Sequence, residues 1–256
     1  MSLHKKKVLF ITTGVITLVV FAGILALLLN IKAFKPQIEA AASTALKMDV
    51  RIKGRMGIAL FPDFGLSLKD VNVRNRGLDV VTIEEMRIGL KFIPLTRFEI
   101  KIIQVGLVKP VFSIVRFKNG MFNLEIPERA LWEKLLAVKK ISVSQGSLVY
   151  TDETSGEKIE VGDLDLDIRG LFSGGTDSSD PFKNISFTGD TRCKILKIYN
   201  FTLMNLVMRA AGEKGVLDLN PVSMNIFGGT GNGSIHVDVT GPSPHYRVIY
   251  ASNRFR

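Results

Sequence analysis

The stretch MRIGLKF, residues 86–92, decides the fold class. Its apolar residues are Met86, Ile88, Leu90 and Phe92, and they alternate with arginine, glycine and lysine. Successive side chains of an extended chain point to opposite sides, so these four residues share one side. A period of two is typical of a strand with one buried face, whereas an amphipathic helix has a period near 3.6. The stretch therefore predicts a strand with one apolar and one polar face.

The same alternation recurs on both sides of this stretch, from Asp49 to Tyr250. It predicts a mostly-β domain of about 12–14 short strands, each of about six residues. Short connections favour antiparallel pairing, because a parallel crossover needs a dozen residues or more. Segments 111–117 and 193–211 carry apolar residues at both alternate positions, so the sequence does not determine which side of each segment faces inward.

Two short helices interrupt the strand pattern. Pro36 suits the first turn of a helix that runs to about residue 46, because proline lacks an N–H that would be unpaired there. Pro127 opens a second helix, over 127–138, which we expect to cap one end of the sheet. A polar, Gly- and Ser-rich loop at 170–181 is the one candidate boundary inside the domain.

The uncharged stretch 8–29 is a predicted transmembrane anchor. Seventeen of its 22 residues are apolar. As a helix it would be about 33 Å long, against a hydrocarbon thickness of about 30 Å. It is longer than the apolar core of a cleaved signal peptide, and no convincing cleavage site follows it. The lysines before it outnumber those directly after it, which favours a cytoplasmic tail at 1–7 and places 30–256 outside the cytoplasm.

Composition excludes several classes of function. Residues 1–35 hold five of the 34 basic groups, which leaves 29 basic against 24 acidic groups, a net charge of +5 for the remainder. That excess is too small for a surface that follows nucleic-acid phosphates, so we expect no nucleic-acid partner. Cys193 is the only cysteine and the chain has three histidines, so an internal disulfide and a Cys-rich zinc site are excluded.

Two further patterns resemble ligand-binding sites but are better explained as ordinary strand and turn sequences. Asp163, Asp165 and Asp167 alternate with apolar residues, which is typical of a solvated strand face, and the Gly and Glu of a calcium loop are missing. The glycines of 228–233 lack the Gly-Lys-Ser/Thr of a phosphate loop and fit a turn between strands. No serine or cysteine lies in a nucleophile elbow. We therefore expect no enzyme activity, no catalytic residue, no cofactor and no metal site.

The apolar side of the predicted sheet poses the main question. Strands of this number and length would make a sheet of roughly 60 Å by 20 Å, with an apolar face near 1,200 Å². A soluble monomer exposes only a few hundred Å², and two short helices cannot cover the rest. The face must pack on another sheet, curl on itself, or be filled by apolar material from outside. By pattern alone a closed sandwich or barrel is the commonest solution.

Several stretches resemble the AsmA family. They are FKPQIEAAA at 34–42, LKMDVRI at 46–52, LFPDFGLSL at 60–68 followed by VNV at 71–73, and IFGGTGNGSI at 226–235. The similarity covers 30–75 and 215–250 and is thinner between them. The order and spacing of these stretches support the resemblance more than any single motif does.

The resemblance implies a single-pass protein of the bacterial inner membrane whose AsmA-like periplasmic domain, over 30–256, forms a curved antiparallel β-sheet groove. AsmA/TamB-like proteins are similar to bridge-like lipid transfer proteins, whose grooves hold phospholipid acyl chains. The implied function is phospholipid transfer or lipid homeostasis between inner and outer membranes, with envelope proteins as partners at the distal end. The alternative is an anchored scaffold that assists outer-membrane protein assembly. The expected groove lining is Ile58, Leu60, Leu66, Leu68, Met86, Ile88, Leu90, Phe92, Phe98, Ile100, Ile102, Leu164, Leu166, Ile168, Met224, Ile226, Ile235 and Val237.

Family members are commonly several hundred residues long, so this sequence suggests either a truncated or a short member. About 60 Å of sheet is only twice the hydrocarbon thickness of one bilayer. We therefore expect that the chain alone does not bridge an envelope and that it needs partners at its far end.

Overall fold

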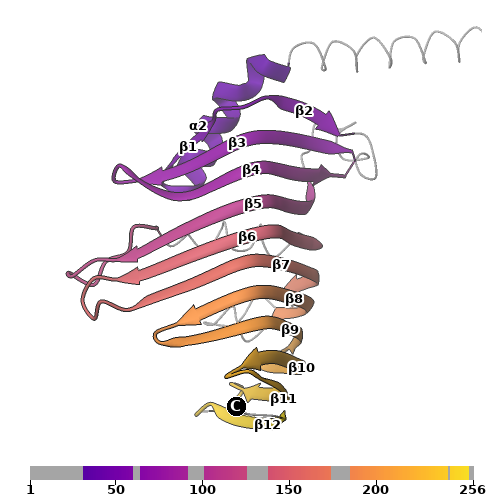
Figure 1. Cartoon of the computed structure of the whole chain (residues 1–256). Helices are drawn as coiled ribbons and strands as arrows, with labels where there is room; N and C mark the ends of the chain where they lie inside the picture. Colours follow the sequence, from indigo (N-terminus) through magenta and orange to yellow (C-terminus); the bar gives the residue numbers. More distant parts are fainter. Residues whose placement is uncertain are drawn as a thin grey trace, which may run out of the picture.

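The computed structural model describes residues 31–59, 64–91, 101–125, 138–173, 185–241 and 243–253. These residues form one 3-10 helix, one α-helix and twelve strands that make a single curved sheet (Figure 1). The elements are η1 (Ile31–Phe34), α2 (Lys35–Leu46), β1 (Asp49–Ile52), β2 (Met56–Ala59), β3 (Gly65–Asn75), β4 (Leu78–Leu90), β5 (Ile102–Arg116), β6 (Lys140–Asp152), β7 (Lys158–Ser173), β8 (Ile185–Ile198), β9 (Phe201–Glu213), β10 (Val216–Ile226), β11 (Gly229–Asp238) and β12 (His245–Asn253).

The strands follow one another across the sheet in chain order. The order is β1-β3-β4-β5-β6-β7-β8-β9-β10-β11-β12, and β2 pairs with β3 beside β1. Neighbours are antiparallel except β5 and β6, which are parallel. The expectation of antiparallel pairing throughout is therefore wrong at this one junction. Residues 117–139 separate the two strands, and a connection of that length is enough for a parallel crossover.

The predicted mostly-β, open and curved architecture is confirmed, but the expected strand length is wrong. From β3 onward the strands have between 9 and 16 residues instead of about six. Within the described residues they make one open layer, so the sandwich or barrel favoured by the pattern alone is not formed there (Figure 1). Strand β7 extends into the predicted loop at 170–181 as far as Ser173 and pairs with β8, so the sheet continues across the candidate boundary.

Most of the long strands resemble two short ones in sequence because their alternation shifts by one residue near the middle. In β3, Leu68 and Val71 are both buried although two residues lie between them. In β6, Val143 and Gly146 show the same spacing, and the pairing registers place each such residue on the same face. Five strands make the shift at a residue with a left-handed backbone, as in β-bulges. These residues are Asp70, Lys109, Gln145, Asp163 and Asn205, with φ between 47° and 53°.

Helix α2 confirms the first predicted helix, with Pro36 in its first turn. Its residues Ile38, Ala42 and Leu46 pack against the buried end of the sheet. That end is the hydrophobic core cluster, which consists of Val50, Ile52, Met56, Leu68, Val71, Val73 and Ile83. The helix therefore covers the apolar face over the first strands only, as its position at the β1 end of the sheet shows (Figure 1).

Other predicted elements lie outside the described residues. The anchor at 8–29 is one of them, and the helix at 127–138 is described only at Val138. None of the helices in the described ranges is long and apolar enough to cross a membrane.

Candidate functional site: a continuous apolar face

One continuous row of paired residues crosses the sheet from β2 to β12. Residues that pair in register across neighbouring strands have their side chains on the same face. Each member of the row pairs with the next, so all of them lie on one side, which we name the apolar face. The row is Ile58, Leu66, Ile88, Val105, Ile141, Ile168, Gly189, Ala210, Leu219, Ile235 and Val248.

A second row runs beside the first on the same face. Its members are Met56, Leu68, Met86, Leu107, Val143, Leu166, Thr191, Met208, Val222, Gly233 and Tyr250. A third row lies beyond the shift in alternation and consists of Val50, Val73, Val81, Phe112, Leu148, Val161, Leu196 and Leu203. The shift thus keeps both halves of each long strand apolar on one side.

Exposure along the apolar face is low beneath α2 and high at β12, although Val143, Ala210 and Val222 between these ends are also buried. Ile52 and Leu68 beneath the helix are almost fully buried. Ile141 and Leu166 in the middle of the sheet are half-buried, and Val248 in β12 is 65% exposed. Beyond the first strands the apolar face is therefore partly accessible to an external apolar molecule.

The structure brings most of the sequence-predicted lining residues together on this face. Ile58, Leu66, Leu68, Met86, Ile88, Leu164, Leu166, Ile168, Met224, Ile226, Ile235 and Val237 all belong to it by register or by alternation within their strands. Leu90 and Ile102 pair with each other at the ends of β4 and β5. Leu60, Phe92, Phe98 and Ile100 lie outside the described residues.

Sequence reasoning missed other residues of the same face. Val105, Leu107 and Met208 are the main ones among the two long rows. Their strands carry apolar residues at both alternate positions, so the inward set cannot be chosen by alternation alone. Their side of the sheet follows from their pairing with residues of neighbouring strands whose side is already known.

The opposite side, which we name the polar face, carries ion pairs between neighbouring strands. Asp167 in β7 accepts from Lys140 in β6 at 3.1 Å and from Arg169 at 2.6 Å. Arg209 in β9 pairs with Asp190 in β8 at 3.0 Å. Partial burial works against the ionised form of Asp167, but the hydrogen bonds from Arg169 and Lys140 outweigh it and lower the pKa of this carboxyl. The polar face is thus suited to water.

Asp163 departs from the predicted solvated row of three aspartates. It has the left-handed backbone of the alternation shift and pairs with Lys194 at 3.6 Å. Asp165 instead accepts the backbone N–H of Gln145. Within the described residues no three His, Cys, Asp or Glu side chains gather in a way that could hold a metal ion.

Glu85 on the polar face makes one contribution to stability depend on pH. Arg87 donates to both of its carboxylate oxygens, at 2.9 and 3.1 Å, and Ser67 donates at 2.9 Å. The hydrogen bonds from Arg87 are the main reason that the pKa of Glu85 is lowered from 4.5 to about 2. The folded state therefore binds this proton less readily than the unfolded state does.

We expect this contribution to be complete above pH 4.5 and to be lost as the pH falls from 4.5 towards 2. Urea unfolding of the wild type and of Glu85→Gln, measured from pH 7 to pH 2.5, checks the expectation. The stability difference between the two proteins should shrink across that window. A difference that stays constant with pH contradicts it.

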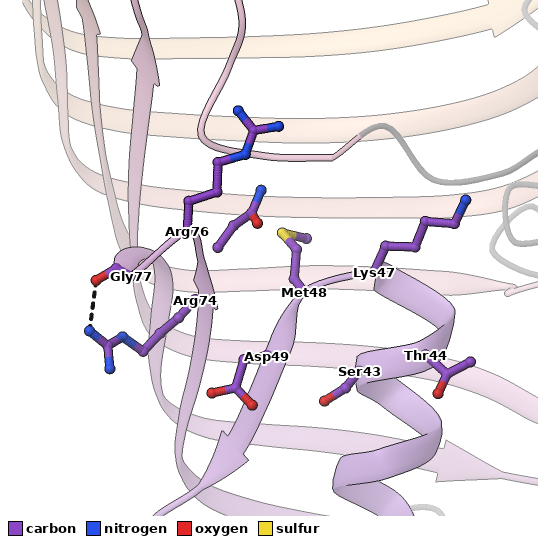
Figure 2. A pocket seen from close by; sticks show the side chains of 9 residues that line it. Ser43, Thr44, Lys47, Met48, Asp49, Arg74, Arg76 and Gly77 are labelled. Atoms are coloured by element: carbon purple, nitrogen blue, oxygen red, sulfur yellow. Dashed lines mark hydrogen bonds between the residues drawn. The ribbon is translucent and has the colours of Figure 1, made fainter.

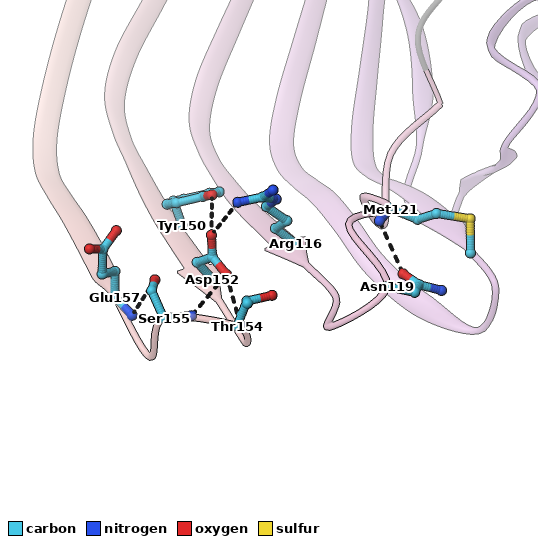
Figure 3. Close-up of polar contacts among 8 residues, drawn as sticks. All are labelled: Arg116, Asn119, Met121, Tyr150, Asp152, Thr154, Ser155 and Glu157. Atoms are coloured by element: carbon cyan, nitrogen blue, oxygen red, sulfur yellow. Dashed lines mark hydrogen bonds and ion pairs between the residues drawn. The ribbon is translucent and has the colours of Figure 1, made fainter.

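A polar cluster at one end of the strands fixes the β6–β7 turn (Figure 3). Asp152 accepts the backbone N–H of Thr154 at 2.8 Å and that of Ser155 at 3.3 Å, and it accepts Arg116 Nη1 at 2.9 Å. The bond from Thr154 and then that from Arg116 lower the pKa of the Asp152 carboxyl. The cluster ties the turn to the end of β5, and all its partners belong to the chain itself.

A cavity of about 490 Å³ lies between the C-terminal end of α2 and the β3–β4 turn (Figure 2). Two arginines line it, but both are engaged. Arg74 pairs with Asp79 at 3.1 Å and donates to the carbonyl of Gly77, and Arg76 pairs with Glu125 at 3.3 Å. The cavity is therefore part of the framework around the turn and not a site of evident chemistry.

These features define a class: a single-layer β-protein with a curved, open sheet that is apolar on one face and ion-paired on the other. The family model for the AsmA family matches residues 1–201, and the chain belongs to this family. The match stops before IFGGTGNGSI at 226–235, so that part of the resemblance stays a prediction. No curated protein matches the chain.

Proposed function

We propose that this protein is anchored in the bacterial inner membrane and carries phospholipid acyl chains along its apolar face towards the outer membrane. The anchor is the stretch 8–29, the tail at 1–7 is cytoplasmic, and the sheet stands in the periplasm. Membership in the AsmA family supports a place in the cell envelope. The role is binding and guidance without a chemical reaction, and it needs no cofactor.

The continuity of the apolar rows supports this proposal most directly. Eleven strands at about 4.8 Å give a row of roughly 48 Å, about three times the length of an acyl tail that spans one leaflet of about 15 Å. Each CH₂ group that leaves water gains about 0.8 kcal/mol wherever it lies on such a row. Because the gain is nearly uniform along the face, a tail is held while it remains free to slide.

The polar face supports the same proposal by exclusion. Its ion pairs and exposed charges favour water on that side, whereas long rows of apolar residues lie on the other, so acyl chains gain more on the apolar face. A lipid headgroup can remain in water at the open margin while the tails contact the sheet. A second layer over the apolar face would remove this surface, and the described strands form only one.

Site-specific photo-crosslinking of the full chain in cells tests the proposal. A photoreactive residue at Met86, Ile88, Leu90, Leu164 or Leu166 is expected to yield phospholipid adducts. Val111 and Val207 are matched controls, because both are exposed apolar residues that lie on the polar face by register. Adducts at the first set and none at the controls support the proposal. Equal yields on both faces would contradict the proposal. Adducts to outer-membrane proteins in place of lipid would also contradict it and would favour the assembly-scaffold alternative.

A further inference from the structure

Positive charge is concentrated in the part of the chain that follows the predicted anchor. Residues 30–76 hold nine basic and four acidic groups, a net charge of +5 over 47 residues. Residues 77–256 hold 22 basic and 20 acidic groups, a net charge of only +2 over 180 residues. The described residues of the first segment form η1, α2 and strands β1 to β3, which lie together at one end of the sheet (Figure 1). The fold therefore gathers the excess positive charge at this end.

Three basic side chains follow one another along the outermost strand positions of that end. Arg51, Lys53 and Arg55 are exposed at alternate positions, whereas Ile52 is buried in the hydrophobic core cluster. The segment 53–55 between β1 and β2 is held to β3 by three backbone hydrogen bonds. We name these three residues the basic edge. Its backbone is fixed by the sheet, and its side chains take no part in the core.

Two members of the basic edge have no ion pair inside the protein. Arg51 pairs with Asp49 at 3.0 Å, and both side chains are exposed. Lys53 and Arg55 form no ion pair with any described residue. A carboxylate oxygen of Asp70 in β3 lies beside the backbone between them, but it forms no ion pair with either side chain. The charges of Lys53 and Arg55 are therefore open to an anion from outside.

Helix α2 decides what kind of partner this edge can meet. The Val50 N–H donates to Ser43 Oγ at 2.9 Å, and the Ile52 N–H donates to Glu39 Oε1 at 2.6 Å. Side chains of the helix thus take the place of a neighbouring strand, and these amides cannot pair with another chain. Glu39 is the only acidic residue of α2, and it is engaged in this contact. A partner of the basic edge therefore meets charged side chains and no free strand.

The predicted anchor keeps the basic edge close to a membrane surface. The predicted span ends at residue 29, and α2 begins six residues later, at Lys35. The 12 residues of α2 are about 18 Å long, and β1 follows directly at Asp49. A short tether of this kind gives the edge a high effective concentration at the bilayer, so weak individual contacts are enough to hold it there.

We propose that the basic edge docks on the anionic lipid headgroups of the membrane that holds the anchor. The inference rests on the anchor of the proposed function but not on the movement of acyl chains along the apolar face. Each basic side chain near an anionic surface favours docking about fivefold, so Lys53 and Arg55 together contribute about 25-fold. Docking stands the sheet on its first edge, and the apolar rows then run away from the bilayer.

Headgroup quenching of a fluorophore on the full chain tests the proposal. The chain is reconstituted into vesicles of phosphatidylcholine alone or with about 30% phosphatidylglycerol, and a short-range quencher is attached to the headgroups. The fluorophore is placed at Gly57→Cys in β2, where a Cβ would meet nothing within 4 Å, in a Cys193→Ser background. We expect strong quenching in the anionic vesicles and weak quenching in the neutral ones.

A second label position shows that quenching reports the edge and not the whole sheet. Thr188 is exposed on the polar face of β8, six strand spacings or roughly 29 Å from the outermost strands. A fluorophore at Thr188→Cys should remain unquenched in both kinds of vesicle. Quenching of this label to the same extent would mean that the sheet lies flat on the bilayer, which overturns docking by the first edge.

Paired charge removals separate the basic edge from net charge. The double variant Lys53→Gln/Arg55→Gln should lower the docked-to-undocked ratio in anionic vesicles about 25-fold. The double variant Arg192→Gln/Lys194→Gln removes the same charge from exposed positions in β8 and should dock like the wild type. High salt should release the wild type as the double edge variant does, because exposed charges are screened.

The outcomes that overturn the docking differ from those that overturn lipid guidance. Equal quenching at Gly57→Cys in neutral and anionic vesicles, or equal losses in the two double variants, would overturn the docking. Phospholipid adducts on the apolar face can persist in either case. A full chain that fails to float with both kinds of vesicle would overturn the anchor and the docking together.

Discussion

Replacing Leu166 with aspartate is expected to lower the affinity for an acyl tail that lies across β7 about 100-fold. Leu166 lies in the middle of β7, where it pairs with Val143 in β6 and Thr191 in β8 on the apolar face. A carboxylate there keeps its water, so a tail that passes it loses contact for about three to four CH₂ groups. At about 0.8 kcal/mol each, that is roughly 3 kcal/mol, or about two orders of magnitude in affinity. The yield of phospholipid adducts from a photoreactive residue at Leu164, which lies on the same face of β7, measures the loss.

Two further variants separate lipid binding from folding. Thr191→Asp adds the same charge to the same face at a position that is already polar, and it should also lose lipid. Thr188→Asp adds it to the polar face, where Thr188 pairs with Arg169, and it should keep wild-type lipid. Full lipid occupancy in both Leu166→Asp and Thr191→Asp, with the sheet intact by circular dichroism, would show that tails do not lie on the apolar face.

Asn123→Ala is expected to lower the free energy of unfolding by about 2–4 kcal/mol. Asn123 is 0% exposed, its Nδ2 donates to the Ser113 carbonyl at 2.7 Å, and its Oδ1 accepts the Val115 N–H at 2.9 Å. Alanine leaves both backbone groups of β5 without a partner, and each buried unsatisfied group costs about 1–3 kcal/mol. Urea denaturation followed by circular dichroism measures the change.

The matched control is Asn119→Ala in the same turn. Asn119 is exposed, and its Oδ1 accepts the Met121 N–H at 3.0 Å (Figure 3). Water can replace that bond, so the loss should stay within about 1 kcal/mol. Equal losses in the two variants would contradict the view that burial makes Asn123 important. The comparison also matters for the fold, because Asn123 holds the chain to β5 where the connection to β6 begins.

Alternation predicted the strands and the face of many residues correctly. MRIGLKF at 86–92 predicted a half-buried strand, and residues 86–90 lie in β4 with Met86 and Ile88 on the apolar face. Twelve of the lining residues proposed from sequence share that face. Alternation depends only on residues that are adjacent in the sequence, so the two sides of a strand are the same whichever strand pairs with it.

Strand length and the parallel junction were not predictable in the same way. Asp163 and Asn205 adopt a left-handed backbone inside long strands, and nothing in their residue type distinguishes them from a turn. Each shift therefore looks like the end of one strand and the start of another. The parallel pairing of β5 and β6 depends on the path of the crossover, which no periodicity encodes.

The chain by itself determined that strands alternate, that one side of them is apolar, and that this side is too broad for two short helices to cover. Only the tertiary structure decided that the described strands form one open layer and that α2 covers its first part. The physical reason is that a side chain's face follows from its immediate neighbours in sequence. Which surface covers that face depends on registers and crossovers between residues far apart in the chain.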